Sequence, residues 1–391
     1  MQVIPPLPFG ATAECHRCDR LLERRTRTGF DLTFVCALAE LILLPAAVFM
    51  PLLDSTIKHL VYQESRLVTS VPVIYSEVWF PFAFGFFFLA FFFPFLRALF
   101  QILVLGSLRL GIGLWQRGRL FRWSEELRIW SLTDVVVLAG VGAYYRAAVD
   151  AQVSVKMGAW LYVAVAILVF IGDRSLDRRA VWDAILPDQR GDPGRHRPSC
   201  DSCEMVVDFR RAGDPCPRCG SRLDRNVAVR FIPTAAAIAA AIPLCIPAYS
   251  AAIMINDQLT GVLEHTILGT VQMLADYGYW QYGAMVLIGG VVIPVTEIAG
   301  LTWLLARVRF PSRDGLVVRT RVFRALHRLV RWPMIIPFLA AIASPIIDFR
   351  GIDDIVAGPG ATPLFMILLL LMLAVRLFEP RLMWRSAGVT A

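Results

Sequence analysis

Four cysteines in the middle of the chain have the spacing of a metal site. They form two Cys-x-x-Cys pairs, Cys200 with Cys203 and Cys216 with Cys219. Two such pairs can place four thiolates tetrahedrally around Zn²⁺. Because sulfur then fills every position around the metal, the spacing predicts a structural zinc ribbon rather than a catalytic site. The alternative is four free cysteines in a linker.

A second, weaker signal lies near the N-terminus. Cys15 and Cys18 form one more Cys-x-x-Cys pair, but no second pair follows before the first long apolar segment. Either this is a decayed ribbon, or it takes further ligands such as His16 or His196. We favour decay, so one zinc site is expected and a second is doubtful.

The elements around these cysteines are predicted to cross a membrane. Of 391 residues, 57% are hydrophobic, and the mean hydropathy is +0.60. A helix needs about 20 apolar residues to span a bilayer. Eight segments meet this need, which predicts an all-α polytopic membrane protein: 32–52, 78–106, 130–149, 157–173, 231–254, 279–305, 332–349 and 361–378.

The positive charges predict how the chain is oriented. With both termini on the cytoplasmic side, only five of the 39 Lys and Arg residues fall outside or at the outer ends of spans. The zinc ribbon is then cytoplasmic. The longest outer loops, 53–77 and 255–278, are expected to form partly amphipathic helices.

Landmarks in the first half return in the second half. Pro94, Trp130 and Trp182 reappear as Pro294, Trp332 and Trp384, at offsets of 200, 202 and 202 residues. The steady offset predicts two tandem four-helix repeats in the same orientation. The expected domains are a degenerate ribbon (1–30), a first repeat (31–185), a four-cysteine ribbon and linker (186–230) and a second repeat (231–385).

Four charged residues lie inside predicted spans, where charge is costly without a partner. Glu40 and Asp134 are expected in a buried polar network. Arg97 and Glu297 each follow a repeated proline by three residues. They either pair with one another across the two repeats or extend to the cytoplasmic headgroups.

Prolines within the spans are expected to kink their helices, because each frees a backbone carbonyl. The candidates are Pro45, Pro94, Pro247 and Pro294.

No enzyme signature is present. The chain lacks the H-E-x-x-H zinc-protease motif, and neither of its two lysines follows a glycine-rich phosphate loop. Nucleic acid is not expected as a partner, because the arginines lie beside apolar spans.

These landmarks together resemble the paraquat-inducible protein A family of Gram-negative inner membranes. The matching segments are CPRCG from Cys216, TILGTVQML from Thr266, VVIPVTEI from Val291, RWPM from Arg331 and FEPRLMW from Phe378. The sequence departs from the family at Glu297, where Lys is frequent, and at Pro333 and Ile336, which replace Ser and Asp. The first half keeps Ser131 and Asp134, so the resemblance places any polar network there.

The resemblance implies a non-enzymatic inner-membrane protein that moves phospholipid or other lipid. Its implied partner is a periplasmic MCE-domain protein, which forms a hydrophobic conduit. Two alternatives stay open. One is an ion- or proton-coupled transporter of small solutes that uses Glu40, Asp134 and Glu297. The other is a metal- or redox-sensing membrane scaffold built around the ribbon.

Overall fold

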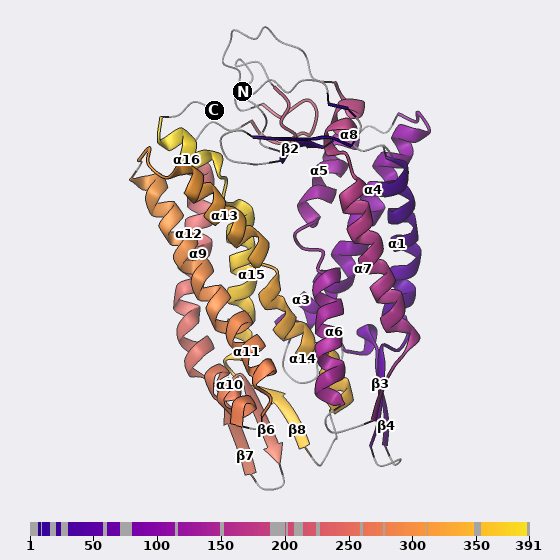
Figure 1. Ribbon diagram of the computed structural model, residues 1–391, viewed down its shortest axis with the longest axis vertical. Coiled ribbons are helices and arrows are strands. Elements are labelled where there is room, and N and C mark those ends of the chain that lie inside the picture. The colour runs from indigo at the N-terminus through magenta and orange to yellow at the C-terminus, as the bar shows by residue number, and fades with distance from the viewer. Residues whose placement is uncertain are drawn as a thin grey trace. The chain divides into compact units, whose positions relative to one another are not determined.

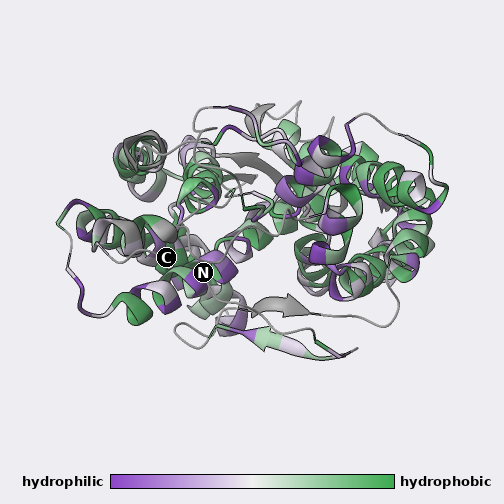
Figure 2. Cartoon of the chain, turned by 90° about the horizontal axis from the view of Figure 1, so that it is seen from above, coloured by the Kyte–Doolittle hydropathy of each residue, from purple (hydrophilic) through white to green (hydrophobic). Residues whose placement is uncertain are grey.

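The protein is mostly helical in the computed structural model (Figure 1). Hydrophobic residues dominate the helices (Figure 2). The structure describes residues 7–8, 10–15, 21–24, 30–57, 61–70, 80–113, 116–148, 152–187, 200, 202–206, 214–223, 227–258, 261–276, 278–310, 312–347 and 353–388.

The first half opens with a short hairpin of β1 (Thr12–Glu14) and β2 (Leu21–Arg24). The membrane segment follows with these elements in chain order: α1 (Asp31–Phe49), β3 (Leu53–Ile57), β4 (Val61–Ser65), α3 (Phe80–Phe87), a π-helical segment η1 (Phe88–Phe92), α4 (Phe93–Arg109), α5 (Arg117–Leu127), α6 (Thr133–Ala147), β5 (Gln152–Val155), α7 (Met157–Ser175) and α8 (Arg178–Ile185).

The second half runs through the same kinds of element in nearly the same order. They are α9 (Val227–Ser250), β6 (Met254–Gln258), β7 (Gly261–His265), α10 (Ile267–Asp276), α11 (Trp280–Leu287), a π-helical segment η3 (Ile288–Val292), α12 (Ile293–Arg309), α13 (Leu316–Leu329), a short 3-10 segment η4 (Trp332–Met334), α14 (Ile335–Ile347), β8 (Asp353–Ala357), α15 (Ala361–Leu377) and α16 (Arg381–Ser386).

Two small antiparallel sheets correct the prediction of an all-α chain. Strand β3 pairs with β4 and with the distant β5, and β6 pairs with β7 and the distant β8. Strands β3, β4, β6 and β7 occupy the two long loops that were expected to form partly amphipathic helices. Within the described residues that expectation holds for residues 67–70 and for α10, whereas the strands of five residues with polar side chains give little periodicity to detect.

Backbone hydrogen bonds at these sheets recur between the halves. Leu52 N donates to Ser65 O at 2.8 Å, and Ile253 N donates to His265 O at 2.9 Å. Gly158 N likewise donates to Pro51 O (2.9 Å), as Gly360 N does to Ala252 O (2.8 Å). The two halves therefore share local geometry as well as element order.

Six helical stretches in the described part of the chain are long and apolar enough to cross a membrane. They are Asp31–Phe49, Phe82–Arg109, Met157–Ser175, Phe231–Ser250, Trp280–Arg309 and Leu316–Ile342. Two of the eight predicted spans appear as the shorter apolar helices α6 and α15. Within Leu316–Ile342, α13 carries four arginines, so α14 is its apolar part.

The chain divides into two compact units that cut across the halves. The first unit contains Met1–Pro45, Phe91–Ser131 and Ala164–Val227; the second contains Ala46–Ala90, Leu132–Val163 and Ala228–Ala391.

Aromatic contacts join segments of both halves within the second unit. Phe86 meets Phe338 edge to face, with ring centroids 5.1 Å apart. Phe82 meets Phe365 in the same way at 5.2 Å. Helices α6 and α14 also pack closely, so the two halves share one core in this unit.

Candidate metal centre and buried charged groups

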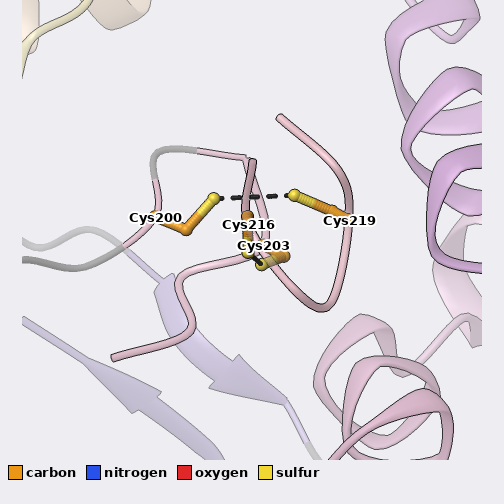
Figure 3. A group of neighbouring side chains, drawn as sticks. All are labelled: Cys200, Cys203, Cys216 and Cys219. Carbon is orange, nitrogen blue, oxygen red and sulfur yellow. Dashed lines mark hydrogen bonds between the residues drawn. The ribbon is translucent and has the colours of Figure 1, made fainter. Parts of the chain in front are cut away.

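The four central cysteines converge, as the spacing predicted. Their ligand atoms lie within 4.8 Å of one another, and all four residues are buried. The Sγ atoms of Cys200 and Cys219 are 3.6 Å apart, as are those of Cys203 and Cys216 (Figure 3). Four thiolates about 2.3 Å from one Zn²⁺ would have edges of about 3.8 Å, so this geometry fits a tetrahedral metal ion.

The two cysteine pairs share one backbone design. Cys200 N donates to Met205 O and Cys216 N to Ser221 O, both at 2.8 Å. The residue after the second cysteine of each pair, Glu204 or Gly220, has a positive φ of 59° or 68°. Glycine adopts this conformation without strain. Each turn thus aims both of its sulfurs inward.

The sulfurs also interact with one another and with a hydroxyl. Their mutual hydrogen bonding lowers the pKa of Cys200 and raises the pKa of Cys203. Ser221 Oγ lies 3.1 Å from Cys200 Sγ and 3.2 Å from Cys219 Sγ. The Ser221 hydroxyl therefore lies beside two of the four candidate metal ligands.

The N-terminal cysteine pair can be followed only in part. Cys15 lies directly after β1 and is half-buried, but Cys18, His16 and His196 lie outside the described residues. A second metal site at this position stays a prediction.

A buried ion pair lies between α4 and α7. The side chain of Arg97 is only 3% exposed, and its guanidinium donates to Asp173. Arg128, at the end of α5, donates to the other oxygen of Asp173 at 3.1 Å. Arg97 therefore has an acidic partner within the first unit and does not extend to the surface.

Glu40 belongs to the same neighbourhood. It is 4% exposed and lines a small crevice with Arg97, Gln101 and Asp173. Glu40 is therefore buried beside the Arg97–Asp173 ion pair, and its part in a polar network stays a prediction.

Glu297 is as deeply buried as Arg97 but differs in its contacts. It is 1% exposed, and its Oε1 has no hydrogen-bond partner among the described residues. Arg97 and Glu297 belong to different units, so their predicted pairing remains untested.

Asp134 does not lie in a buried network, which corrects that expectation. Its side chain is 58% exposed and accepts from Arg331 at 2.6 Å. Ser131 is buried, but its hydroxyl donates to the backbone carbonyl of Leu127 at 3.1 Å. Ser131 therefore bonds to the preceding helical turn, whereas Asp134 pairs with a residue of the second half.

The predicted kink prolines occupy two kinds of position. Pro45 and Pro247 lie inside α1 and α9. Pro94 and Pro294 are the second residues of α4 and α12, directly after the π-helical segments. A π-helical turn has a widened hydrogen-bond ladder and is frequent at functional sites.

A tyrosine hydroxyl contacts each π-helical segment. Tyr162 donates to Ala90 O at 2.7 Å, and Tyr249 donates to Gly290 O at 3.0 Å. Ala90 and Gly290 are the third residues of η1 and η3. The tyrosines come from different helices of the two halves, α7 and α9, so only the carbonyl position is shared.

Sequence reasoning missed Asp173, Arg128 and the two tyrosines. Asp173 was assigned to the end of an apolar span, where a charge is common and uninformative. A signal was available, since a buried Arg97 requires an acid and the segment 171–174 supplies one at the end of α7.

Known proteins resemble the chain over nearly its whole length. The family profile described as Paraquat-inducible protein A matches twice, at residues 31–186 and 232–388. Intermembrane transport protein PqiA of Escherichia coli strain K12 is 24% identical over 392 residues, covering 97% of this chain and 92% of that protein.

Two further relatives agree with this match. The "Probable intermembrane transport protein" of Haemophilus influenzae is 23% identical, covering 95% of this chain and 90% of its own. "Lipophilic envelope-spanning tunnel protein A" of Escherichia coli K12 is 27% identical, covering 66% of this chain and 61% of its own. No solved structure matches the chain.

These names belong to transport proteins, which confirms that the chain is not an enzyme. The apolar helices and the match together identify the chain as an envelope membrane protein. The profile covers well over half of the sequence, so the chain belongs to the paraquat-inducible protein A family.

Proposed function

We propose that the chain is an inner-membrane subunit of an envelope lipid-transport system. It would pass phospholipid or other lipid between the inner membrane and a periplasmic MCE-domain protein. The observation that carries this proposal is the double family match, since curated relatives are named for intermembrane transport and for a lipophilic tunnel.

The proposed architecture is two tandem four-helix repeats, 31–185 and 231–385, with eight spans and cytoplasmic termini. The shared element order and recurring sheet hydrogen bonds support the duplication. The helices α6 and α15 supply the two spans shorter than the other six. In this orientation the small sheets face the periplasm, where an MCE-domain partner would lie.

The four-cysteine site is proposed to hold one structural Zn²⁺. All four donors are thiolates, the ligand type that selects zinc in closed structural sites. Such an ion would fix the two cysteine turns and leave no position for a substrate.

Reconstitution tests lipid transfer directly. The purified protein is placed in donor vesicles with a fluorescent phospholipid, and the MCE-domain protein from the same organism is added with acceptor vesicles. Transfer should require both proteins and should stop when either is omitted. Transfer by the MCE protein alone, or no lipid co-purifying with the chain, would contradict the proposal.

An ion-coupled transporter of small solutes is the second candidate. The buried Glu40 favours it, as does Glu297, whose Oε1 lacks a partner among the described residues, because intramembrane carboxylates often mark ion pathways. Solute uptake by the chain alone in vesicles, lost in Glu297→Gln, would support this candidate over lipid transfer. A metal-sensing scaffold instead predicts that Cys216→Ser abolishes a cellular response and leaves lipid transfer intact.

A further inference from the structure

The metal ribbon does not form a separate module. All four cysteines and Met205 belong to a single buried cluster with side chains of α4, α5 and α8. At its centre the rings of Phe121 and Trp182 meet at 4.8 Å. Since the ligands themselves are part of this core, a change at the metal site reaches the helices directly.

The backbone of the second cysteine turn lies close against α5 at one glycine. A Cβ atom on Gly118 would lie 1.7 Å from the carbonyl oxygen of Arg218, far inside van der Waals contact. Only glycine therefore allows the turn to sit this close to α5. Arg218 lies between the ligands Cys216 and Cys219, so this contact holds the metal-binding loop itself.

An ion pair fastens the same turn to α8. The side chain of Arg218 is 3% exposed, and its guanidinium donates to Asp183 at 3.2 Å. A buried cation whose acidic partner is removed is strongly destabilised. Asp183 is therefore a positioning residue for the ribbon.

From α8 the ion pairs continue toward the buried arginine. Arg178 of α8 contacts Glu125 of α5 at 2.7 Å. Arg128, directly after α5, contacts Asp173, which in turn pairs with Arg97. A shift of α5 and α8 would therefore change the position of Arg128 and, through it, the Asp173–Arg97 ion pair.

The second half keeps the aromatic residues but not the contacts of this surface. Phe323 and Trp384 stand 202 residues after Phe121 and Trp182. At the same offset, Thr320 replaces Gly118, and its Oγ1 accepts from Trp384 Nε1 at 3.2 Å. At this offset in the sequence, Arg385 stands in place of the acidic residue Asp183. The sequences of α13 and α16 therefore lack both the glycine and the acidic residue that contact the ribbon in the first half.

We propose that the ribbon docks on the face formed by α5 and α8 and that this docking depends on bound metal. Gly118 allows the close contact, and Asp183 pairs with Arg218 of the ribbon. Metal binding orders the two cysteine turns, the turns dock, and docking fixes α5, α8 and the Arg97–Asp173 pair. A ribbon too small for its own core unfolds when its metal leaves. The contact between the ribbon and the α5–α8 face is then lost as well. This proposal does not depend on the identity of the transported molecule.

Hydrogen exchange with mass spectrometry tests the proposal on the full-length protein in detergent. The zinc-loaded protein is compared with protein treated with a zinc chelator. Exchange in 117–127 and 178–185 should rise by about tenfold or more, because local opening sets the exchange rate. The counterpart helices 316–329 and 381–386 should be unchanged. A rise confined to 200–223, or an equal rise in 316–329, would overturn the proposal.

Two substitutions separate docking from metal binding. Gly118→Ala places a methyl group against the Arg218 carbonyl and touches no ligand, so one zinc per chain should remain while exchange in 178–185 rises. Gly113→Ala is the matched control, because a Cβ there meets nothing within 4 Å. If Gly118→Ala does not fold, Asp183→Asn should give the same pattern to a smaller extent. Retained zinc with unchanged exchange in both variants would refute the docking role.

Discussion

The two halves of the chain place opposite charges at one position, three residues after a proline that follows a π-helical segment. In the first half this residue is Arg97, which is ion-paired with Asp173. In the second half it is Glu297, whose Oε1 has no partner among the described residues. Both residues are almost fully buried. The same backbone position therefore carries a paired cation in one half and, in the other, an acid whose Oε1 has no partner among the described residues.

The comparison suggests a division of roles. A buried charge with an ion-pair partner, such as Arg97, becomes costly to disturb because loss of one member leaves the other charge buried alone. A buried polar atom without a partner reduces stability and calls for an explanation such as function or an unseen ligand. The first half, with its ribbon, would then contribute rigidity, and the second half would keep a reactive group available.

Replacing one metal ligand should have the largest effect on stability, and that effect should be on the first half. Cys216→Ser is expected to reduce bound zinc from one per chain to nearly none, because structural zinc contributes on the order of 10 kcal/mol in small zinc domains. Elemental analysis and thermal unfolding of the purified protein would measure this. Cys245→Ser, inside α9, is the control and should keep its zinc; loss of zinc there would contradict the assigned ligands.

Neutralising the two buried charged residues should give the next largest effect, and the effect on stability should differ between the two halves. Arg97→Gln is expected to lower the free energy of unfolding by about 3 kcal/mol, since Asp173 loses its buried partner. Glu297→Gln should leave stability unchanged or raise it by about 1 kcal/mol, because it removes a buried carboxylate whose Oε1 has no partner among the described residues. Chemical unfolding in detergent gives both values. Equal losses in the two variants would show that Glu297 is paired in the folded protein.

The tyrosines beside the π-helical segments provide a finer comparison. Tyr162→Phe should cost about 1–2 kcal/mol, because the fully buried carbonyl of Ala90 loses its hydroxyl donor. Tyr249→Phe should cost less, about 0.5–1 kcal/mol, since Tyr249 is only half-buried and its hydrogen bond is longer. The same unfolding measurement applies, and a reversed order would argue against burial as the cause.

The smallest effect is expected at the exposed ion pair. Asp134→Asn should change stability by less than about 1 kcal/mol, because the pair with Arg331 is largely open to its surroundings. Asp134→Asn should also leave lipid transfer unchanged. Abolished transport in this variant would restore Asp134 to the functional site.

The metal centre was predictable because its ligands are encoded by local spacing. Cys200, Cys203, Cys216 and Cys219 needed only two tight turns to meet, and the glycine after Cys219 signalled one of them. The membrane helices were predictable for a similar reason, since run length alone identifies them.

The remaining features depend on contacts between segments far apart in sequence. The role of Asp173 follows from its ion pair with Arg97, which lies on another helix. The strands β5 and β8 are short and pair only with distant partners, so no local pattern marks them. The docking of the ribbon on the half that precedes it was equally hidden, because Gly118 appears in the sequence as an ordinary loop-to-helix glycine.

The strand order also has a consequence for how the chain is made. Strand β5 must pair with β3, and Leu53 is matched with Val155 only after the intervening helices have been synthesised. A two-stranded hairpin is marginally stable by itself. Each sheet therefore becomes stable late in the synthesis of its own half, when the third strand has emerged from the ribosome. The β8 strand repeats this step in the second half, so a chain stopped before Asp353 would leave the second sheet unfinished.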